Sequence, residues 1–155
     1  MLPLNIITDF AAQIGVTLPA NAPERFNLYA RLLLDANEKI NLTAITEPQA
    51  VAVRHFCDSL TLLEASNPPP GVRVADVGTG AGFPGVVLLI VRPDLKITLI
   101  DGLKKRLTVL ADILEKLANE GINVSYMYGY SSEGVSNLIL KVSDPDKAAV
   151  ILETC

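Results

Sequence analysis

Residues 74–85 read VADVGTGAGFPG, and this stretch constrains the fold more than any other part of the sequence. An apolar run ends in four glycines, at positions 78, 80, 82 and 85, with a phenylalanine and a proline before the last one. Glycine is costly inside a regular element because its backbone loses more freedom on folding than that of other residues. We therefore expect a strand-to-helix bend here, in which glycines supply positive φ angles or let a ligand approach the backbone.

Short apolar strands alternate with helices around this bend and beyond it. We expect strands at 72–77, 96–100, 122–128 and 148–152, and helices at 84–91, 103–118 and 135–142. Consecutive parallel strands need a crossover helix between them, so this alternation predicts an α/β fold with a parallel sheet.

The sequence before residue 67 has the periodicity of helices instead. Apolar residues at helical spacing predict helices at 4–14, from Asn21 to about residue 40, and at 48–65. The run Asn67–Gly71 reads NPPPG and ends this region, because neither a helix nor a strand continues through consecutive prolines. We therefore divide the chain into an N-terminal helical extension, residues 1–66, and a ligand-binding α/β domain, residues 67–155.

Composition limits the setting and the partners of the chain. Its 155 residues carry a net charge of -4, which argues against a general nucleic-acid coat but leaves room for a local basic face. The longest uncharged apolar run, Gly85–Val91, is too short to span a membrane, and we see no secretory signal. Two distant cysteines and one histidine predict a cytoplasmic setting and no metal site.

A bend between a strand and a helix directs backbone N–H groups and the positive end of a helix toward a ligand. Residues 80–85 satisfy the G-x-G-x-x-G pattern of dinucleotide sites, and Asp101 ends the next strand, where it can accept hydrogen bonds from ribose hydroxyls. NAD and S-adenosylmethionine both fit these features. A third alternative is a tight bend that needs small residues for packing alone.

Two residues favour S-adenosylmethionine over a dinucleotide. Asp76 precedes the first glycine, where a carboxylate is unsuited to a diphosphate but suits the sulfonium and amino groups of the methyl donor. Pro84 removes an N–H group from the start of the helix, which is unfavourable if that end must hold a diphosphate. We therefore expect a methyl-donor site, with NAD as the alternative.

These motifs resemble the glucose-inhibited division protein B family, the small-subunit ribosomal RNA guanine-N7 methyltransferases also called ribosomal small subunit methyltransferase G. The stretch Asp76–Gly85 resembles the first motif of the family, and Gly102 stands where the family usually has serine. Further matches occur in the family's order: N-L-T at 41–43, R-H-x-x-D-S at 54–59, R-P at 92–93, T-L-I-D at 98–101 and K-R at 105–106.

The resemblance implies a Rossmann-like, S-adenosylmethionine-dependent methyltransferase fold with an N-terminal helical extension. It implies a substrate guanine in small-subunit ribosomal RNA, either free or in the assembled subunit. By resemblance, Gly78 and Phe83 line the methyl-donor pocket and Asp101 holds the ribose. Phe83 as a core aromatic residue and Asp101 as a helix cap are the alternatives. The predicted cofactor-binding residues are Asp76, Gly78, Gly80, Gly82, Phe83, Asp101, Ser131 and Ser132.

We expect no dedicated catalytic base, because the sequence shows neither a nucleophile–histidine arrangement nor paired carboxylates. N7 of guanine carries an in-plane lone pair and can attack a methyl group without first losing a proton. Catalysis then needs positioning and the exclusion of water.

Basic residues near the expected pocket are candidates for RNA contact. Lys104, Lys105 and Arg106 open the helix after Asp101, and a solvated helix face is the alternative interpretation of this run. Arg54 and Lys39 are further candidates.

The R-H-x-x-D-S motif is expected on one face of the third helix. Arg54 and Asp58 are spaced i,i+4, which predicts an ion pair. We interpret His55 as a packed or hydrogen-bonded residue rather than a catalyst.

The family pattern breaks down after the third strand. The family's G-R-A-E segment corresponds to Gly129–Glu133, where Ser131, Ser132 or Glu133 is expected to replace the small residue and the acid that approach the adenine. The later strands of the family have no counterpart, so we expect an incomplete sheet in a truncated or diverged chain, with an exposed edge for self-association. A non-catalytic module that binds the methyl donor or RNA is the main alternative function, and a dinucleotide-binding domain is the second.

Overall fold

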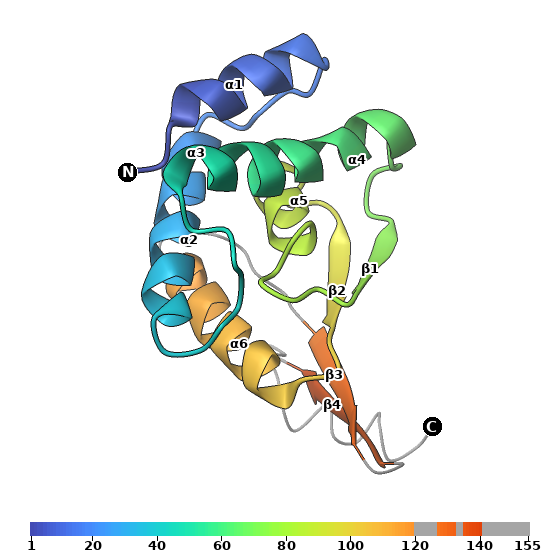
Figure 1. The fold of residues 1–155 in the computed structure, drawn as a ribbon. Coiled ribbons are helices and arrows are strands. Elements are labelled where there is room, and N and C mark those ends of the chain that lie inside the picture. Colours follow the sequence, from blue (N-terminus) through green and yellow to red (C-terminus); the bar gives the residue numbers. More distant parts are fainter. Residues whose placement is uncertain (120–126, 133–134, 141–155) are drawn as a thin grey trace.

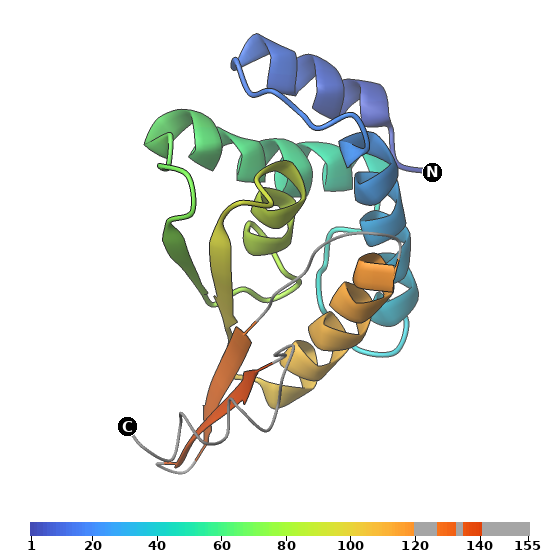
Figure 2. The ribbon, with the colours of Figure 1, turned by 180° about the vertical axis from the view of Figure 1, so that it is seen from behind.

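A computed structural model describes residues 1–119, 127–132 and 135–140 of the chain. These residues form a helical N-terminal part and a sheet whose helices lie to one side of its strands (Figure 1). Strand β1 (Arg73–Val77) lies at the outer edge of the sheet, also when the molecule is seen from behind (Figure 2).

The N-terminal part is helical, as predicted. Its segments are α1 (Leu4–Gln13), α2 (Ala22–Asn37), α3 (Pro48–Val51), the π-helix η1 (Ala52–Cys57) and α4 (Asp58–Ser66). The last three follow one another without a break and form one long rod, which crosses the upper part of Figure 1. The π-helical turn inside this rod was not predicted.

Local chemistry explains where these helices begin and end. Pro23 lies in the first turn of α2, where a missing N–H group leaves no hydrogen bond unmade. The Glu47 carboxylate accepts hydrogen bonds from the N–H groups of Gln49 and Ala50 and so caps the start of α3. Asn67 adopts a left-handed backbone, with φ of 38°, and ends α4 just before the prolines.

The sheet follows the expected alternation of strands and helices up to its third strand. After β1 come α5 (Gly85–Val91), β2 (Lys96–Ile100), α6 (Lys104–Asn119), β3 (Met127–Ser132) and β4 (Val135–Leu140). Strands β1, β2 and β3 are parallel neighbours, and Val77, Ile100 and Gly129 align near their carboxyl ends.

The helix predicted at 135–142 is wrong, because residues 135–140 form strand β4, antiparallel to β3. Apolar residues at 135, 138 and 139 have helical spacing, but so short a segment fits either period, and pairing with β3 decides the outcome. Strand β3 extends to Ser132, beyond the predicted end at residue 128. Residues 122–126 and the strand expected at 148–152 lie outside the described residues.

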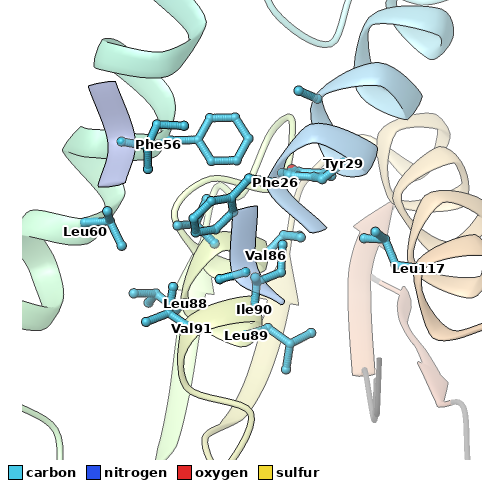
Figure 3. Packing of buried hydrophobic residues seen from close by; sticks show 14 of the residues in the cluster. Phe26, Tyr29, Phe56, Leu60, Val86, Leu88, Leu89, Ile90, Val91 and Leu117 are labelled. Atoms are coloured by element: carbon cyan, nitrogen blue, oxygen red, sulfur yellow. The ribbon is translucent and has the colours of Figure 1, made fainter. Parts of the chain in front are cut away.

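One hydrophobic core joins the helical extension to the sheet. Phe26 and Tyr29 of α2 and Phe56 of η1 pack toward α5 (Figure 3). Every residue of α5 is buried, because this helix lies among β2, α2 and α4. Its all-apolar sequence is therefore a consequence of its position. The bend that leads from β1 into α5 is attached to the helical extension through this core.

Candidate functional site

The bend between β1 and α5, residues 78–84, is called the glycine loop below, and it starts at the carboxyl edge of the parallel strands. Gly78, Gly80 and Gly82 have φ angles of 82°, 57° and 93°, a region that residues with side chains rarely adopt. The N–H groups of Gly78 and Thr79 both donate to the Ile100 carbonyl, at 2.8 and 2.9 Å. The loop is thus tied to the end of β2, where parallel sheets bind ligands.

The glycines of this region fall into two pairs. A Cβ atom on Gly78 would meet nothing within 4 Å, and one on Gly80 would meet only a carbonyl oxygen at 3.8 Å. A Cβ on Gly82 would lie 2.5 Å from the Tyr29 hydroxyl, and one on Gly85 would clash with side chains of β1 and β2. Gly82 and Gly85 are therefore needed for packing, whereas Gly78 and Gly80 leave the backbone open to a ligand.

Asp76 is buried near the end of β1 and bonds within the protein. Its Oδ2 accepts hydrogen bonds from the Thr79 hydroxyl, at 2.7 Å, and from the Gly85 N–H group, at 3.0 Å. Burial raises the pKa of this carboxyl group, and the two hydrogen bonds oppose the rise. The Asp76 carboxylate thus joins the beginning of the glycine loop to the start of α5.

The first N–H groups of α5 are used within the protein. Pro84 has none, the Gly85 N–H donates to Asp76, and the Val86 N–H donates to the Gly82 carbonyl at 2.8 Å. A dinucleotide site uses such groups to hold its diphosphate. The start of α5 is therefore poorly suited to NAD.

Asp101 directly follows β2 and is buried. Its Oδ2 accepts the Gly80 N–H at 2.9 Å, and its Oδ1 accepts the Leu103 N–H at 2.8 Å. The Arg106 guanidinium lies 3.9 Å from the same Oδ2. Asp101 therefore supports the turn into α6, as its alternative interpretation expected, and it also lies against the open backbone of the glycine loop.

Phe83 lies in an aromatic cluster that the helical extension builds. Its ring stacks on the His55 imidazole, with centroids 4.3 Å apart and planes 7° from parallel. The rings of Tyr29 and Phe56 approach it with centroid distances of 5.3 and 5.4 Å. Phe83 is half-buried, so it belongs to the core and to the surface of the loop at once.

Tyr29 positions the glycine loop, a role that sequence analysis missed. Its fully buried hydroxyl donates to the Ala81 carbonyl, at 2.5 Å. Burial raises the pKa of the Tyr29 phenol well above its ordinary value, and the Asp76 charge adds to the rise, so the group remains a donor. The signal in the sequence was a tyrosine among the apolar residues that recur at helical spacing in this helix, because a buried tyrosine hydroxyl needs a hydrogen-bond partner.

The N-L-T and R-H-x-x-D-S motifs meet beside the glycine loop. The Thr43 hydroxyl and His55 Nε2 form a hydrogen bond of 2.9 Å. Asn37 Oδ1, which sequence analysis also missed, accepts the N–H groups of Leu42 and Thr43 at 2.8 and 2.9 Å. Burial lowers the pKa of His55, and the Asp58 charge opposes this. His55 is thus packed and hydrogen-bonded, as we expected.

These segments line a cavity of about 600 Å³, called the loop–helix cavity below. One wall is the glycine loop, with Phe83, and a second is the N-L-T segment, with Thr43. The third wall comes from η1 and α4 and includes Arg54, His55 and Asp58.

The expected ion pair between Arg54 and Asp58 is wrong. None of the ion pairs among the described residues joins them. Arg54 lies in the π-helix η1 and Asp58 begins α4, so the two residues stand on either side of a change in helical register that the i,i+4 rule does not consider. Both side chains are exposed and line the loop–helix cavity.

Basic residues from two distant parts of the chain gather around a second hollow, of about 670 Å³. Lys39 follows α2, whereas Lys104, Lys105 and Arg106 open α6, and all four line this hollow together with Gly102. Arg54 does not line this hollow. An acidic chain therefore has a local basic surface, the basic hollow, next to Asp101.

Ser131 and Ser132 lie in β3 itself, whereas Glu133 lies outside the described residues. Gly129 aligns with Ile100, the last residue of β2. Ser131 and Ser132 come after Gly129 in β3 and therefore lie beyond the carboxyl end of β2. Their backbones align with β4. Their contact with adenine stays a prediction.

No helix in the described part of the chain has the length and apolar character needed to cross a membrane. The same residues bring together no group of three or more side chains suited to a metal ion. Cys57 is a buried free thiol, and burial raises its pKa.

Comparison with known proteins assigns the chain to a family. The family model described as rRNA small subunit methyltransferase G matches residues 22–126. The chain belongs to this family. Curated relatives named Ribosomal RNA small subunit methyltransferase G include proteins of Caldanaerobacter subterraneus subsp. tengcongensis, 40% identical over 121 residues, and of Desulforamulus reducens, 46% identical over 107 residues.

These two matches cover 78% and 69% of this chain and 51% and 45% of the relatives. A third relative, from Lactobacillus delbrueckii subsp. bulgaricus, is 46% identical over 65% of this chain and 43% of its own length. The chain thus spans about half the length of the curated methyltransferase G relatives it matches. The residues that the family model matches include the glycine loop and Asp101. The fold is α/β and Rossmann-like, as predicted.

Proposed function

We propose that this chain binds S-adenosylmethionine on its glycine loop and serves the methylation of N7 of a guanine in small-subunit ribosomal RNA. One observation carries the proposal: the open backbone at Gly78 and Gly80 lies beside the buried carboxylate of Asp101, at the carboxyl edge of a parallel sheet. Membership of the methyltransferase G family supports the same activity.

The residues at this edge fit a methyl donor. Gly78 and Gly80 present main chain with no Cβ atom in the way. Asp101 has acceptor positions left for ribose hydroxyls, because a carboxylate offers about four and the N–H groups of Gly80 and Leu103 use one each. No diphosphate is needed, which agrees with the internal use of the first N–H groups of α5.

The other predicted cofactor residues flank or shape this edge. Asp76 and Gly82 act on the shape of the glycine loop through Thr79 and Tyr29. Phe83 forms the neighbouring surface. For Ser131 and Ser132 we propose contact with the adenine, from the end of β3.

The chemistry asks little of the protein beyond positioning. When bound, S-adenosylmethionine supplies a methyl group that N7 takes through its lone pair, as the carbon–sulfur bond breaks and its electrons stay on sulfur. No residue of this chain has to remove a proton, since N7 has none to lose. Gly78, Gly80 and Asp101 would fix the donor, and the rings at Phe83 would keep water from one side of the loop.

The basic hollow is the proposed contact for the RNA backbone. Lys39, Lys104 and Lys105 line it beside Asp101, so bound phosphates would lie close to the methyl donor. Arg106 combines a place in the hollow with its contact to Asp101. The proposed partner is small-subunit ribosomal RNA, free or in the assembled subunit, and the proposed location is therefore the cytoplasm.

Titration calorimetry tests the ligand, and methyl transfer tests the activity. We expect the chain to bind S-adenosylhomocysteine more tightly than NAD, and the reverse order would overturn the methyl-donor site. We expect methyl incorporation into small ribosomal subunits that lack the modification. Binding of S-adenosylhomocysteine without incorporation would refute the activity and leave the site.

A non-catalytic binding module is the second candidate, favoured by the exposed edge strand of the sheet. In that role we propose self-association through β1, the edge strand, where Val77 is 77% exposed. Sedimentation velocity should show a dimer that the Val77→Lys variant loses. A monomer at every concentration would contradict this role of the edge.

A further inference from the structure

We propose that the loop–helix cavity binds the target guanine base, with the Watson–Crick edge of the base on the Asp58 carboxylate and its plane on the accessible side of the Phe83–His55 ring stack. This inference rests on the proposed function and adds to it the place where the acceptor base is recognised. The occupant is a single guanine turned out of its stack, as enzymes that modify bases require.

The cavity adjoins the proposed methyl-donor site. Thr79, Ala81 and Phe83 line it, and they alternate along one loop with the open backbone of Gly78 and Gly80. A base in the cavity and a methyl donor on the open backbone would therefore contact neighbouring residues of the same loop. The volume of about 600 Å³ lies within the usual range for ligand sites.

A stack of two aromatic rings is already assembled at this cavity. The rings of Phe83 and His55 are stacked in parallel, and both residues are only half-buried, so part of the stack remains accessible. Thr43 holds His55 through its hydrogen bond, and the rings of Tyr29 and Phe56 support Phe83 from the core. Proteins that recognise single RNA bases hold them on such side chains.

Asp58 supplies a group that distinguishes guanine from adenine. Its carboxylate lines the cavity, is exposed and forms no ion pair with Arg54. Guanine presents two adjacent donors on its Watson–Crick edge, the N1–H and the exocyclic amino group, and a carboxylate can accept both. Adenine presents an acceptor at N1, which a carboxylate repels.

This orientation leaves N7 free to react. N7 lies on the opposite side of the purine from N1 and the exocyclic amino group, so a base held by Asp58 turns N7 away from α4. Arg54 lines the same cavity and is exposed, so its guanidinium can bind the phosphate of the same nucleotide.

Nucleotide titrations of the full chain saturated with S-adenosylhomocysteine test this assignment by amide chemical-shift changes. We expect guanosine monophosphate to bind more tightly than inosine monophosphate, which lacks the amino group, and than adenosine monophosphate. Asp58→Asn should weaken guanosine monophosphate binding about tenfold and remove its advantage over the inosine compound. Affinity for S-adenosylhomocysteine should stay unchanged.

Asp112→Asn is the matched control, because Asp112 is an exposed carboxylate on α6 outside this cavity. It should leave both affinities as in the wild type. Absence of S-adenosylhomocysteine binding in the wild type refutes the proposed function. Intact S-adenosylhomocysteine binding with no preference for guanine, or a preference that survives in Asp58→Asn, overturns the role of the cavity alone.

Discussion

Gly78→Ala and Gly15→Ala form a matched pair that separates backbone strain from ligand contact. Both glycines have positive φ angles, 82° and 73°, and a Cβ atom on either would meet nothing within 4 Å. Gly15 follows α1 at the far end of the helical extension, whereas Gly78 opens the glycine loop. The two alanines therefore carry similar strain and differ in what approaches them.

We expect each variant to lose about 1–2 kcal/mol of unfolding free energy, the usual cost of a left-handed backbone for a residue with a Cβ atom. Urea denaturation without ligand should show this loss in both. In Gly78→Ala the added methyl group would also occupy space that the methyl donor needs, a clash of about 1–3 kcal/mol. Calorimetry should then show S-adenosylhomocysteine binding weakened about tenfold or more in Gly78→Ala and unchanged in Gly15→Ala.

Equal affinities for S-adenosylhomocysteine in the wild type and Gly78→Ala would refute the proposed methyl-donor site on the glycine loop. So would an equal loss in the two variants, because the effect would then come from strain alone. Gly82→Ala extends the comparison, since its Cβ would lie 2.5 Å from the Tyr29 hydroxyl and 2.9 Å from Leu110. That variant should lose stability through overpacking, by more than either member of the pair.

Three further perturbations test other parts of the site. Tyr29→Phe leaves the Ala81 carbonyl without its buried donor and should cost about 1–3 kcal/mol in urea denaturation. His55 should make stability depend on pH: burial lowers its folded-state pKa, so its contribution is present above the ordinary value of 6.5 and is lost as the pH falls through the lowered value. His55→Gln should flatten the curve of unfolding free energy between pH 7.5 and 5. Lys105→Ala should weaken binding of a ribosomal RNA fragment and reduce the salt slope by about one, with S-adenosylhomocysteine binding unchanged.

Each of these has an outcome that contradicts it. A Tyr29→Phe variant as stable as the wild type would mean that the Ala81 carbonyl finds another donor. An unchanged pH profile in His55→Gln would show that other groups set the dependence. An unchanged salt slope in Lys105→Ala would remove that residue from the RNA contact.

Elements whose cause is local could be predicted from the sequence. Strand β2 has the predicted bounds, and α5 differs by one residue, because an apolar run of uniform character is bounded by turn residues on both sides. The glycine loop was predictable as well, because so many glycines close together indicate a bend. Its positive φ angles follow from a concentration of glycine that nothing but a bend can use.

Features that depend on distant partners could not be predicted. Gly82 is needed for packing whereas Gly78 is open, and this difference depends on Tyr29, which lies about fifty residues earlier in the sequence. Nothing in the sequence marks the change of register between η1 and α4, so the failure of the Arg54–Asp58 pair could not be predicted. Strand β4 owes its form to pairing with β3, which outweighs an ambiguous local pattern.

The hydrogen bond from Tyr29 to Ala81 ties the ligand loop to α2 mechanically. Fraying of α2 would withdraw the tyrosine and release the turn between Gly80 and Gly82, while β1 and β2 could stay paired. Helix α2 thus holds the loop in its shape. A fragment that begins at the sheet would keep every residue of the loop but would lack this support.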